Sequence, residues 1–206
     1  MEGIHLITNG RLTTEELKKI PFLQSELDYI HIREKNKTAQ ELQSILSFLK
    51  ENEVSKKKLI INDRVDLAVL NHCHGVQLAY HSLSVKAVKN SFPKLTIGKS
   101  VHSLEEAIQA EKEGATFLIF GHVFASLSKI GLPSRGLNSL QKITQSVSLP
   151  TIAIGGITPP QRTRAVLEAG ASGIAIMSGI WNAKDSSEAL KSYRDVFNDW
   201  KEGGVV

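Results

Sequence analysis

Cysteine is almost absent from this chain of 206 residues, and its scarcity restricts where the protein works. With Cys73 alone no internal disulfide can form, so we expect a protein of a reducing compartment, the cytoplasm. Long apolar runs are absent too. No stretch approaches the ~20 apolar residues that cross a bilayer, so we expect no membrane partner. The first residues, MEGIHLIT, enter a predicted strand and lack the apolar core of a signal peptide.

Linkers are also missing. No Pro- and Ser-rich segment, low-complexity tract or solenoid repeat interrupts the sequence. Hydrophobic residues make up 41% of the chain and charged residues 22%, which is ordinary for a globular protein. We therefore expect one domain that spans residues 1–206.

A strong excess of one charge is missing as well, since the formal net charge is +4. The basic cluster Lys56–Lys58 falls between a predicted helix and a predicted strand, where we expect a solvated loop. A single short cluster is a poor nucleic-acid surface, so we expect no nucleic-acid partner. The excess positive charge suits a small phosphorylated substrate.

What the sequence does contain is a regular alternation of apolar runs and amphipathic segments. The apolar runs predict strands at residues 4–8, 28–33, 58–62, 75–79, 96–101, 116–121, 151–154 and 173–177. Segments of helical period follow them at residues 13–24, 38–52, 64–72, 84–92, 103–114, 137–147, 158–170 and 186–204. This alternation predicts an α/β fold, the TIM (β/α)8 barrel, whose active sites lie at the carboxyl ends of the strands.

Residue types at the expected helix ends support this assignment. The pairs Thr13–Glu16 and Ser103–Glu106 have the spacing of capping boxes. Thr158 is expected to cap the seventh helix, with Pro159 at its first position and Gly170 at its end.

The last two predicted strands end in small residues, in TIAIGG at 151–156 and GIAIMSG at 173–179. Backbone N–H groups are accessible at such turns, and barrel enzymes hold phosphate groups after strands seven and eight. We therefore predict a phosphate site at Gly155, Gly156 and Ser178. The alternative is that these glycines only make tight turns.

Basic side chains end the second predicted strand, YIHIREK at 29–35. Strand alternation places Ile30 and Ile32 on one face and His31, Arg33 and Lys35 on the other. If the isoleucines face the helices, three basic groups line the barrel mouth. The alternative is an exposed strand end with solvated cations.

Polar residues also follow the third and fifth strands. Asn62 and Asp63 could bind substrate or Mg²⁺, although Asp63 could equally cap the next helix. Ser100 has the parity of an inward-pointing residue. Lys129 lies in the longest irregular segment, Val123–Arg135, which we interpret as a functional flap that closes over an anion.

Histidines occur at two informative places. His122 follows an apolar strand, and an imidazole with a pKa of about 6.5 exchanges protons near neutral pH, although a histidine at a strand end is by itself more often structural. The run His72–His74 has the residue types of a metal site but falls at the non-catalytic end of the barrel, so we expect no metal there.

Taken together, the blocks of this chain resemble the thiamine phosphate synthase superfamily over its whole length. The matching blocks are HIREK at 31–35, IINDRVDLA at 60–68, GVQL at 75–78, IGKSVHSLEEA at 97–107, FGHVFASLSK at 120–129, PTIAIGGI at 150–157 and GIAIMSGI at 173–180. In that superfamily the synthase couples a pyrimidine pyrophosphate to a thiazole phosphate with Mg²⁺. The resemblance implies substrate-binding roles for Arg33, Lys35, Asn62, Asp63, Ser100, Ser126, Ser128, Lys129, Gly156, Met177 and Ser178.

Two positions depart from the synthase pattern. The synthase block after GVQL reads GQED, whose Asp binds Mg²⁺, whereas Ser82 stands in that place here. Synthases also have proline where this chain has His122. Both departures resemble the thiazole tautomerase branch (TenI type), in which this histidine is the acid/base residue.

The resemblance to that branch implies an isomerase of thiamine biosynthesis. It would aromatise 2-[2-carboxy-4-methylthiazol-5(2H)-ylidene]ethyl phosphate, with His122 taking the C2 proton and delivering one to the exocyclic carbon. Arg33 or Lys35 would neutralise the substrate carboxylate, and no metal or other cofactor would be needed. The alternatives are thiamine phosphate synthase itself and a non-catalytic regulatory protein on the same scaffold. The expected partner is the small-molecule substrate, and a homo-oligomer is compatible with this interpretation.

Overall fold

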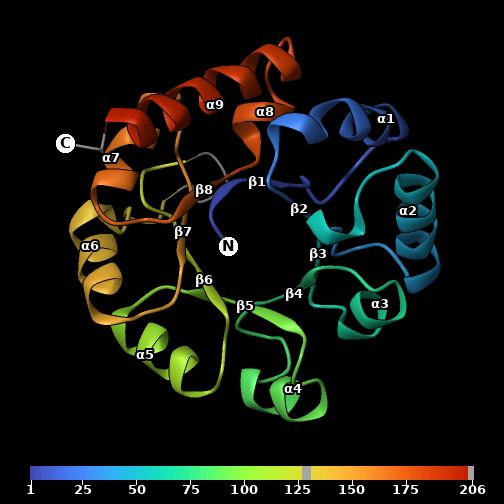
Figure 1. Cartoon of the computed structure of the whole chain (residues 1–206), viewed down its shortest axis with the longest axis horizontal. Coiled ribbons are helices and arrows are strands. Elements are labelled where there is room, and N and C mark those ends of the chain that lie inside the picture. The colour runs from blue at the N-terminus through green and yellow to red at the C-terminus, as the bar shows by residue number, and fades with distance from the viewer. Residues whose placement is uncertain (127–130, 204–206) are drawn as a thin grey trace.

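Short apolar strands pair in parallel and in sequence order, and the last pairs with the first to close a barrel (Figure 1). The computed structural model describes residues 1–126 and 131–203. In this part of the chain the strands are β1 (Gly3–Ile7), β2 (Tyr29–Ile32), β3 (Leu59–Asn62), β4 (Gly75–Leu78), β5 (Thr96–Val101), β6 (Phe117–Gly121), β7 (Thr151–Ile154) and β8 (Gly173–Ile176). The predicted TIM barrel is confirmed.

Helices surround the barrel in Figure 1. In the described residues they are α1 (Thr14–Leu23), α2 (Ala39–Glu51), α3 (Val65–Leu70), α4 (Val85–Ser91), α5 (Leu104–Lys112), α6 (Gly136–Ser146), α7 (Arg162–Glu168), α8 (Ser178–Trp181) and α9 (Ser186–Gly203), with the 3-10 helices η1 (Gln24–Glu26) and η2 (Lys56–Lys58). Helix α8 is not among the predicted helices. It forms because the Met177 carbonyl accepts hydrogen bonds from the N–H groups of Ile180 and Trp181.

The two predicted capping boxes differ in outcome. Thr13 Oγ1 accepts from the Glu16 N–H at 3.2 Å, and the Glu16 carboxylate accepts from the Thr13 N–H at 2.8 Å, which completes the first box. Ser103 Oγ accepts from the Glu106 N–H, but the Glu106 carboxylate accepts from the N–H of His102 instead. The second box is therefore only half formed.

The N-cap predicted at Thr158 is wrong, because α7 begins at Arg162. The Thr158 hydroxyl lies 3.1 Å from the Tyr193 hydroxyl of α9, so a tertiary contact replaces the local cap. Gly170 follows the end of α7 with φ +87°, as expected of a helix-terminating glycine.

Strand alternation separates an outer core from the barrel interior. Ile30 and Ile32 face outward and are buried in the core that joins strands to helices. The pairing registers stack the inward residues in layers contributed by alternate strands. One layer consists of His31, Gln77, Ile119 and Ala175, and the layer beneath it consists of His5, Ile60, Gly98 and Ile152. Polar side chains thus stand in the middle of the barrel.

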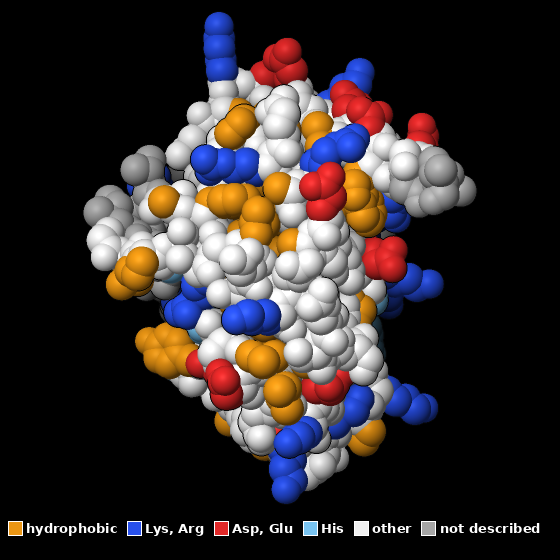
Figure 2. Space-filling view, turned by 90° about the vertical axis from the view of Figure 1, so that its left-hand side faces the viewer, with side chains coloured by type: hydrophobic (Ala, Val, Ile, Leu, Met, Phe, Trp, Pro, Cys, Tyr) orange, Lys and Arg blue, Asp and Glu red, His pale blue; other side chains and the backbone are white. Residues whose placement is uncertain are grey.

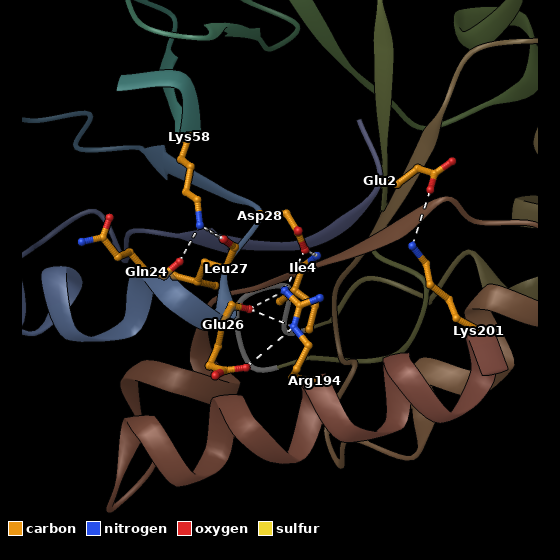
Figure 3. Close-up of polar contacts among 9 residues, drawn as sticks. All are labelled: Glu2, Ile4, Gln24, Glu26, Leu27, Asp28, Lys58, Arg194 and Lys201. Atoms are coloured by element: carbon orange, nitrogen blue, oxygen red, sulfur yellow. Dashed lines mark hydrogen bonds and ion pairs between the residues drawn. The ribbon is translucent and has the colours of Figure 1, made fainter. Parts of the chain in front are cut away.

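The amino end of the barrel is fixed to α9 by Arg194 (Figure 3). Its guanidinium donates to the Glu26 carbonyl and, at 2.8 Å, to the Asp28 carboxylate, which also accepts from the Ile4 N–H at 2.8 Å. One arginine thereby joins α9, η1 and β1.

Lys58 makes a second connection at this end (Figure 3). Its ammonium donates to the carbonyls of Gln24 and Leu27, each at 2.7 Å. The solvated loop predicted for Lys56–Lys58 is therefore wrong for Lys58, because η2 turns this side chain toward the carbonyls around η1.

Charges of both signs are interspersed on the face that carries α5, α6 and α7, drawn in Figure 2. The net charge of +4 is thus not concentrated in a broad basic patch on the described residues of this face. Within the described part of the chain, no helix is long and apolar enough to span a membrane.

Candidate active site

A cavity of about 380 Å³ opens at the carboxyl ends of the strands. Its lining includes His122 and nine of the predicted binding residues, which are Arg33, Lys35, Asn62, Ser100, Ser126, Gly155, Gly156, Met177 and Ser178. Two further predicted residues, Ser128 and Lys129, lie outside the described residues. The fold therefore brings side chains from most of the barrel strands to one cavity.

One wall of the cavity is basic. Arg33 and Lys35 follow β2 and line the cavity, as the alternation predicted. Between them Glu34 is buried, and its carboxylate accepts from the N–H groups of Gly10 (3.1 Å) and Leu12 (3.0 Å). Glu34 is not among the predicted site residues. It fixes the loop after β1 against the end of β2 and so positions the two cations.

A smaller cavity of about 210 Å³ shares Lys35, Asn62 and His81 with the main one and also includes Asp63. Asp63 Oδ2 lies 3.5 Å from His81 Nε2. The possible capping role of Asp63 is not seen, because the N-cap of α3 is Arg64. Asp63 instead lines the smaller cavity, next to the main one.

The opposite wall contains the glycine turn after β7. Gly155 and Gly156 have φ of +99° and +67°, which L side chains rarely adopt. The Gly155 carbonyl accepts from the Phe124 N–H at 3.0 Å, so the N–H of the same peptide, on Gly156, points away from Phe124. A Cβ on Gly156 would lie 2.4 Å from the Ala125 carbonyl oxygen. Glycine is needed here for the backbone itself, whatever the turn binds.

The floor of the cavity is the layer that contains His31 and Gln77. Burial, and next the nearby His74, lowers the pKa of His31 to about 3. The prediction of three basic groups at the mouth is therefore corrected to two, because His31 is neutral at physiological pH. Gln77 is not among the predicted site residues, although a polar residue of inward parity within the apolar strand GVQL is a signal for it.

The sequence pattern that defines the family described as "Thiamine monophosphate synthase" matches residues 4–180. The chain belongs to this family.

Relatives in the thiamine monophosphate synthase family agree in their names. The thiamine-phosphate synthase of Pyrococcus furiosus is 36% identical over 197 residues, covering 95% of this chain and 95% of that protein. That of Coprothermobacter proteolyticus is 40% identical over 148 residues, covering 71% and 68%. The solved thiamine phosphate pyrophosphorylase of P. furiosus superposes with a TM-score of 0.83 at 32% identity over 96% of both chains.

The tautomerase interpretation, and with it the isomerase class, is therefore wrong, since these relatives are named as synthases. It depended on Ser82 and His122. In this member of the thiamine monophosphate synthase family both residues have local structural contacts. Ser82 Oγ accepts from the Ala79 N–H at 2.7 Å and closes the turn after β4.

His122 is 7% exposed, and its Nε2 lies 3.0 Å from the Pro133 carbonyl oxygen. A carbonyl only accepts, so Nε2 carries a proton and donates it to this bond. His122 thus connects the end of β6 to the segment before α6, and a histidine at this position does not by itself indicate proton transfer.

Proposed function

We propose that this protein is a thiamine-phosphate synthase that joins a pyrimidine pyrophosphate to a thiazole phosphate and releases pyrophosphate. One observation carries the proposal: a single cavity has a basic wall at Arg33 and Lys35 and a glycine turn of the phosphate-binding type opposite. Two anionic substrates need two such sites within reach of one another. The names of the relatives support the same activity.

The coupling requires no acid or base. The bond between the pyrimidine methylene carbon and the pyrophosphate oxygen breaks, and its electron pair leaves with pyrophosphate. The lone pair of the thiazole nitrogen forms the new C–N bond. Negative charge therefore grows on the leaving group, which Arg33 and Lys35 would stabilise with the Asn62 amide as a further donor.

The thiazole phosphate would bind at Gly155, Gly156 and Ser178, across the cavity from the cations. Between the two anion sites the cavity is lined by Ile119 and Ala175, among others. These apolar groups orient the rings and exclude water, which would otherwise compete with the thiazole nitrogen for the pyrimidine carbon.

The family resemblance implies Mg²⁺, and the oxygen donors beside the cavity fit it. Mg²⁺ keeps several waters and is held by one or two carboxylates together with substrate phosphates. Asp63 supplies one carboxylate and Asn62 a carbonyl oxygen, and both line the smaller cavity. When bound, the ion would neutralise pyrophosphate charge. Since Ser82 adds no second carboxylate, the substrate would supply a larger share of the ligands.

The test is to incubate the purified protein with both substrates and Mg²⁺ and to measure thiamine phosphate and pyrophosphate. We expect equal amounts of the two products and loss of both when EDTA removes the metal. As a matched variant, Asp63→Asn keeps the shape of the side chain but should require a higher Mg²⁺ concentration. If the folded protein forms no thiamine phosphate, the proposal is wrong.

A further inference from the structure

An arginine outside the cavity holds the glycine turn after β7. Arg162 is the first residue of α7, and its Nη1 donates to the Gly156 carbonyl at 2.7 Å. Gly156 lines the cavity, whereas Arg162 is not among the lining residues in the described part of the chain. Hydrogen bonds from a charged donor are stronger than neutral ones, so this contact can hold the turn in one orientation. Arg162 can therefore act on a ligand in the cavity through this turn or through its charge.

The guanidinium of Arg162 is itself held in place. Its central carbon lies 4.8 Å from the centroid of the Phe124 ring, as in a cation–π contact. Phe124 is partly buried against the core, and its N–H donates to the Gly155 carbonyl at 3.0 Å. Arg162 thus joins the start of α7, the turn after β7 and the segment after β6. A planar group that stacks and donates at the same time is available from arginine and not from lysine.

These contacts set the orientation of two successive peptide groups. The Gly155 carbonyl accepts from Phe124 and the Gly156 carbonyl from Arg162. In a trans peptide the C=O and N–H groups point in opposite directions, so the N–H groups of Gly156 and Ile157 point away from these two partners. Among the described residues neither N–H group has an acceptor. Backbone donors are rarely left so, and both belong to residues that line the cavity.

We propose that Arg162 is a positioning residue for an anion site at this turn: by holding the Gly156 carbonyl it keeps the Ile157 N–H directed into the cavity beside that of Gly156. Successive N–H groups in a turn of this kind bind anions, and the ligand class is a phosphate monoester. The guanidinium also polarises the peptide that it contacts, which makes the Ile157 N–H a stronger donor. The inference rests on the proposed function in one respect, the identity of that monoester as thiazole phosphate.

Binding of inorganic phosphate tests this geometry without turnover. The probe is ¹⁵N-labelled protein, and the Kd is read from the amide signals of Gly156 and Ile157, since phosphate can also bind elsewhere in the cavity. In the wild type we expect both signals to move with one Kd. Arg162→Met should raise this Kd about fivefold, the effect of one hydrogen bond, and should reduce the shift of the Ile157 signal more than that of Gly156. A wild-type Ile157 amide that does not respond to phosphate would overturn the inference.

Arg164→Met is the matched control for charge. Arg164 is exposed on the same helix, and its side chain makes no hydrogen bond or ion pair within the described residues. Residues two apart lie on different sides of a helix, so this variant removes one positive charge and spares the turn. The Kd should stay within about twofold of the wild type, because a distant exposed charge is screened. Equal weakening by Arg162→Met and Arg164→Met would overturn the inference.

The kinetic test separates positioning from a general loss of structure. In Arg162→Met we expect the KM for thiazole phosphate to rise about fivefold, with kcat and the KM for the pyrimidine pyrophosphate within about twofold. Arg162→Lys can still donate but does not stack as a planar group, so it should recover part of the loss. Thermal unfolding checks that the variants are folded. Equal increases in the two KM values would overturn the inference.

The proposed function fails separately. A wild type that makes no thiamine phosphate refutes the synthase, whereas the phosphate titration of the two arginine variants decides the role of Arg162 without any turnover.

Discussion

Arg194 and Arg33 carry the same charge at opposite ends of the barrel, and their surroundings differ. The Arg194 guanidinium is held by the Glu26 carbonyl and the Asp28 carboxylate, so the protein itself compensates its charge. Arg33 lines the cavity at the other end, where the proposed substrate brings the negative charge. At the amino end the charge is paired within the protein, whereas at the carboxyl end, under the proposed function, the charge is available to bind a substrate.

Replacing Arg33 should have the largest effect, and it should be on activity. We expect Arg33→Ala to lower kcat/KM by at least about a hundredfold, because the pyrophosphate loses a charge-assisted donor. The melting temperature should stay within about 2 °C. Arg33→Lys keeps the charge without the planar guanidinium, so its kcat/KM should lie between those of the wild type and Arg33→Ala. Steady-state kinetics and thermal unfolding measure both quantities, and an unchanged kcat/KM would remove Arg33 from the site.

Arg194 should show the opposite profile. We expect Arg194→Met to lower the free energy of unfolding by about 2 kcal/mol through loss of hydrogen bonds to charged and carbonyl acceptors, with kcat/KM unchanged. The control is Lys201→Met, which removes an exposed 3.7 Å ion pair with Glu2 and should cost less than about 0.5 kcal/mol (Figure 3). Urea unfolding measures both. If Arg194→Met and Lys201→Met lowered the free energy of unfolding equally, Arg194 would not be a special stabilising contact of the amino end.

The buried histidines should make stability depend on pH. The pKa of His31 in the folded state is about 3 and that of His5 is also lowered, so the unfolded chain binds more protons below pH ~6.5. The contribution of the two neutral histidines to the free energy of unfolding is then fully present above that pH. It is lost as the pH decreases, by up to about 1.4 kcal/mol per pH unit for each histidine.

Urea unfolding between pH 7 and pH 5 gives the slope. His5→Gln removes one titrating group and should flatten it, whereas His72→Asn, at an exposed position with φ +51° that Asn tolerates, should leave it unchanged. Identical slopes in all three proteins would mean that the His5–His31 pair does not titrate on unfolding.

The smallest expected effect concerns the metal. Ser82→Asp places a second carboxylate at the turn after β4 and should lower the Mg²⁺ concentration for half-maximal rate, by up to about tenfold. Ser82→Asn offers an acceptor to the Ala79 N–H without the charge and should not. Titration of activity with Mg²⁺ tests this, and equal curves for the two variants would show that position 82 does not face the ion.

Local periodicity was sufficient to predict the barrel and much of the lining of its mouth. The parity of HIREK placed Arg33 and Lys35 in the cavity, and the glycine turn was recognised from its small residues. The His5–His31 bond could not be predicted in this way, because it depends on the stagger between β1 and β2, which no local pattern contains. Thr158 was misread because its hydroxyl meets Tyr193 of a distant helix.

The tautomerase prediction is wrong for a different reason. It depends on two positions, Ser82 and His122, whereas many residues of the chain match the synthase pattern. A missing carboxylate weakens a metal site whose other ligands come from the substrate, but it does not abolish it. A histidine whose Nε2 already donates to Pro133 is explained by that bond.

The pairing of β1 with β8, which closes the barrel, has a consequence for how the chain folds during synthesis. Gly3 to Leu6 pair with Gly173 to Ile176, and Trp181 Nε1 donates to the Ile7 carbonyl across 174 residues of sequence. On the ribosome β1 emerges early and its edge stays without this partner until β8 follows. The turn after β8, which belongs to the proposed phosphate site, emerges at the same moment. The nascent chain therefore completes the last strand pairing and this turn together, and under the proposed function a thiazole phosphate present during synthesis would favour closure of the barrel.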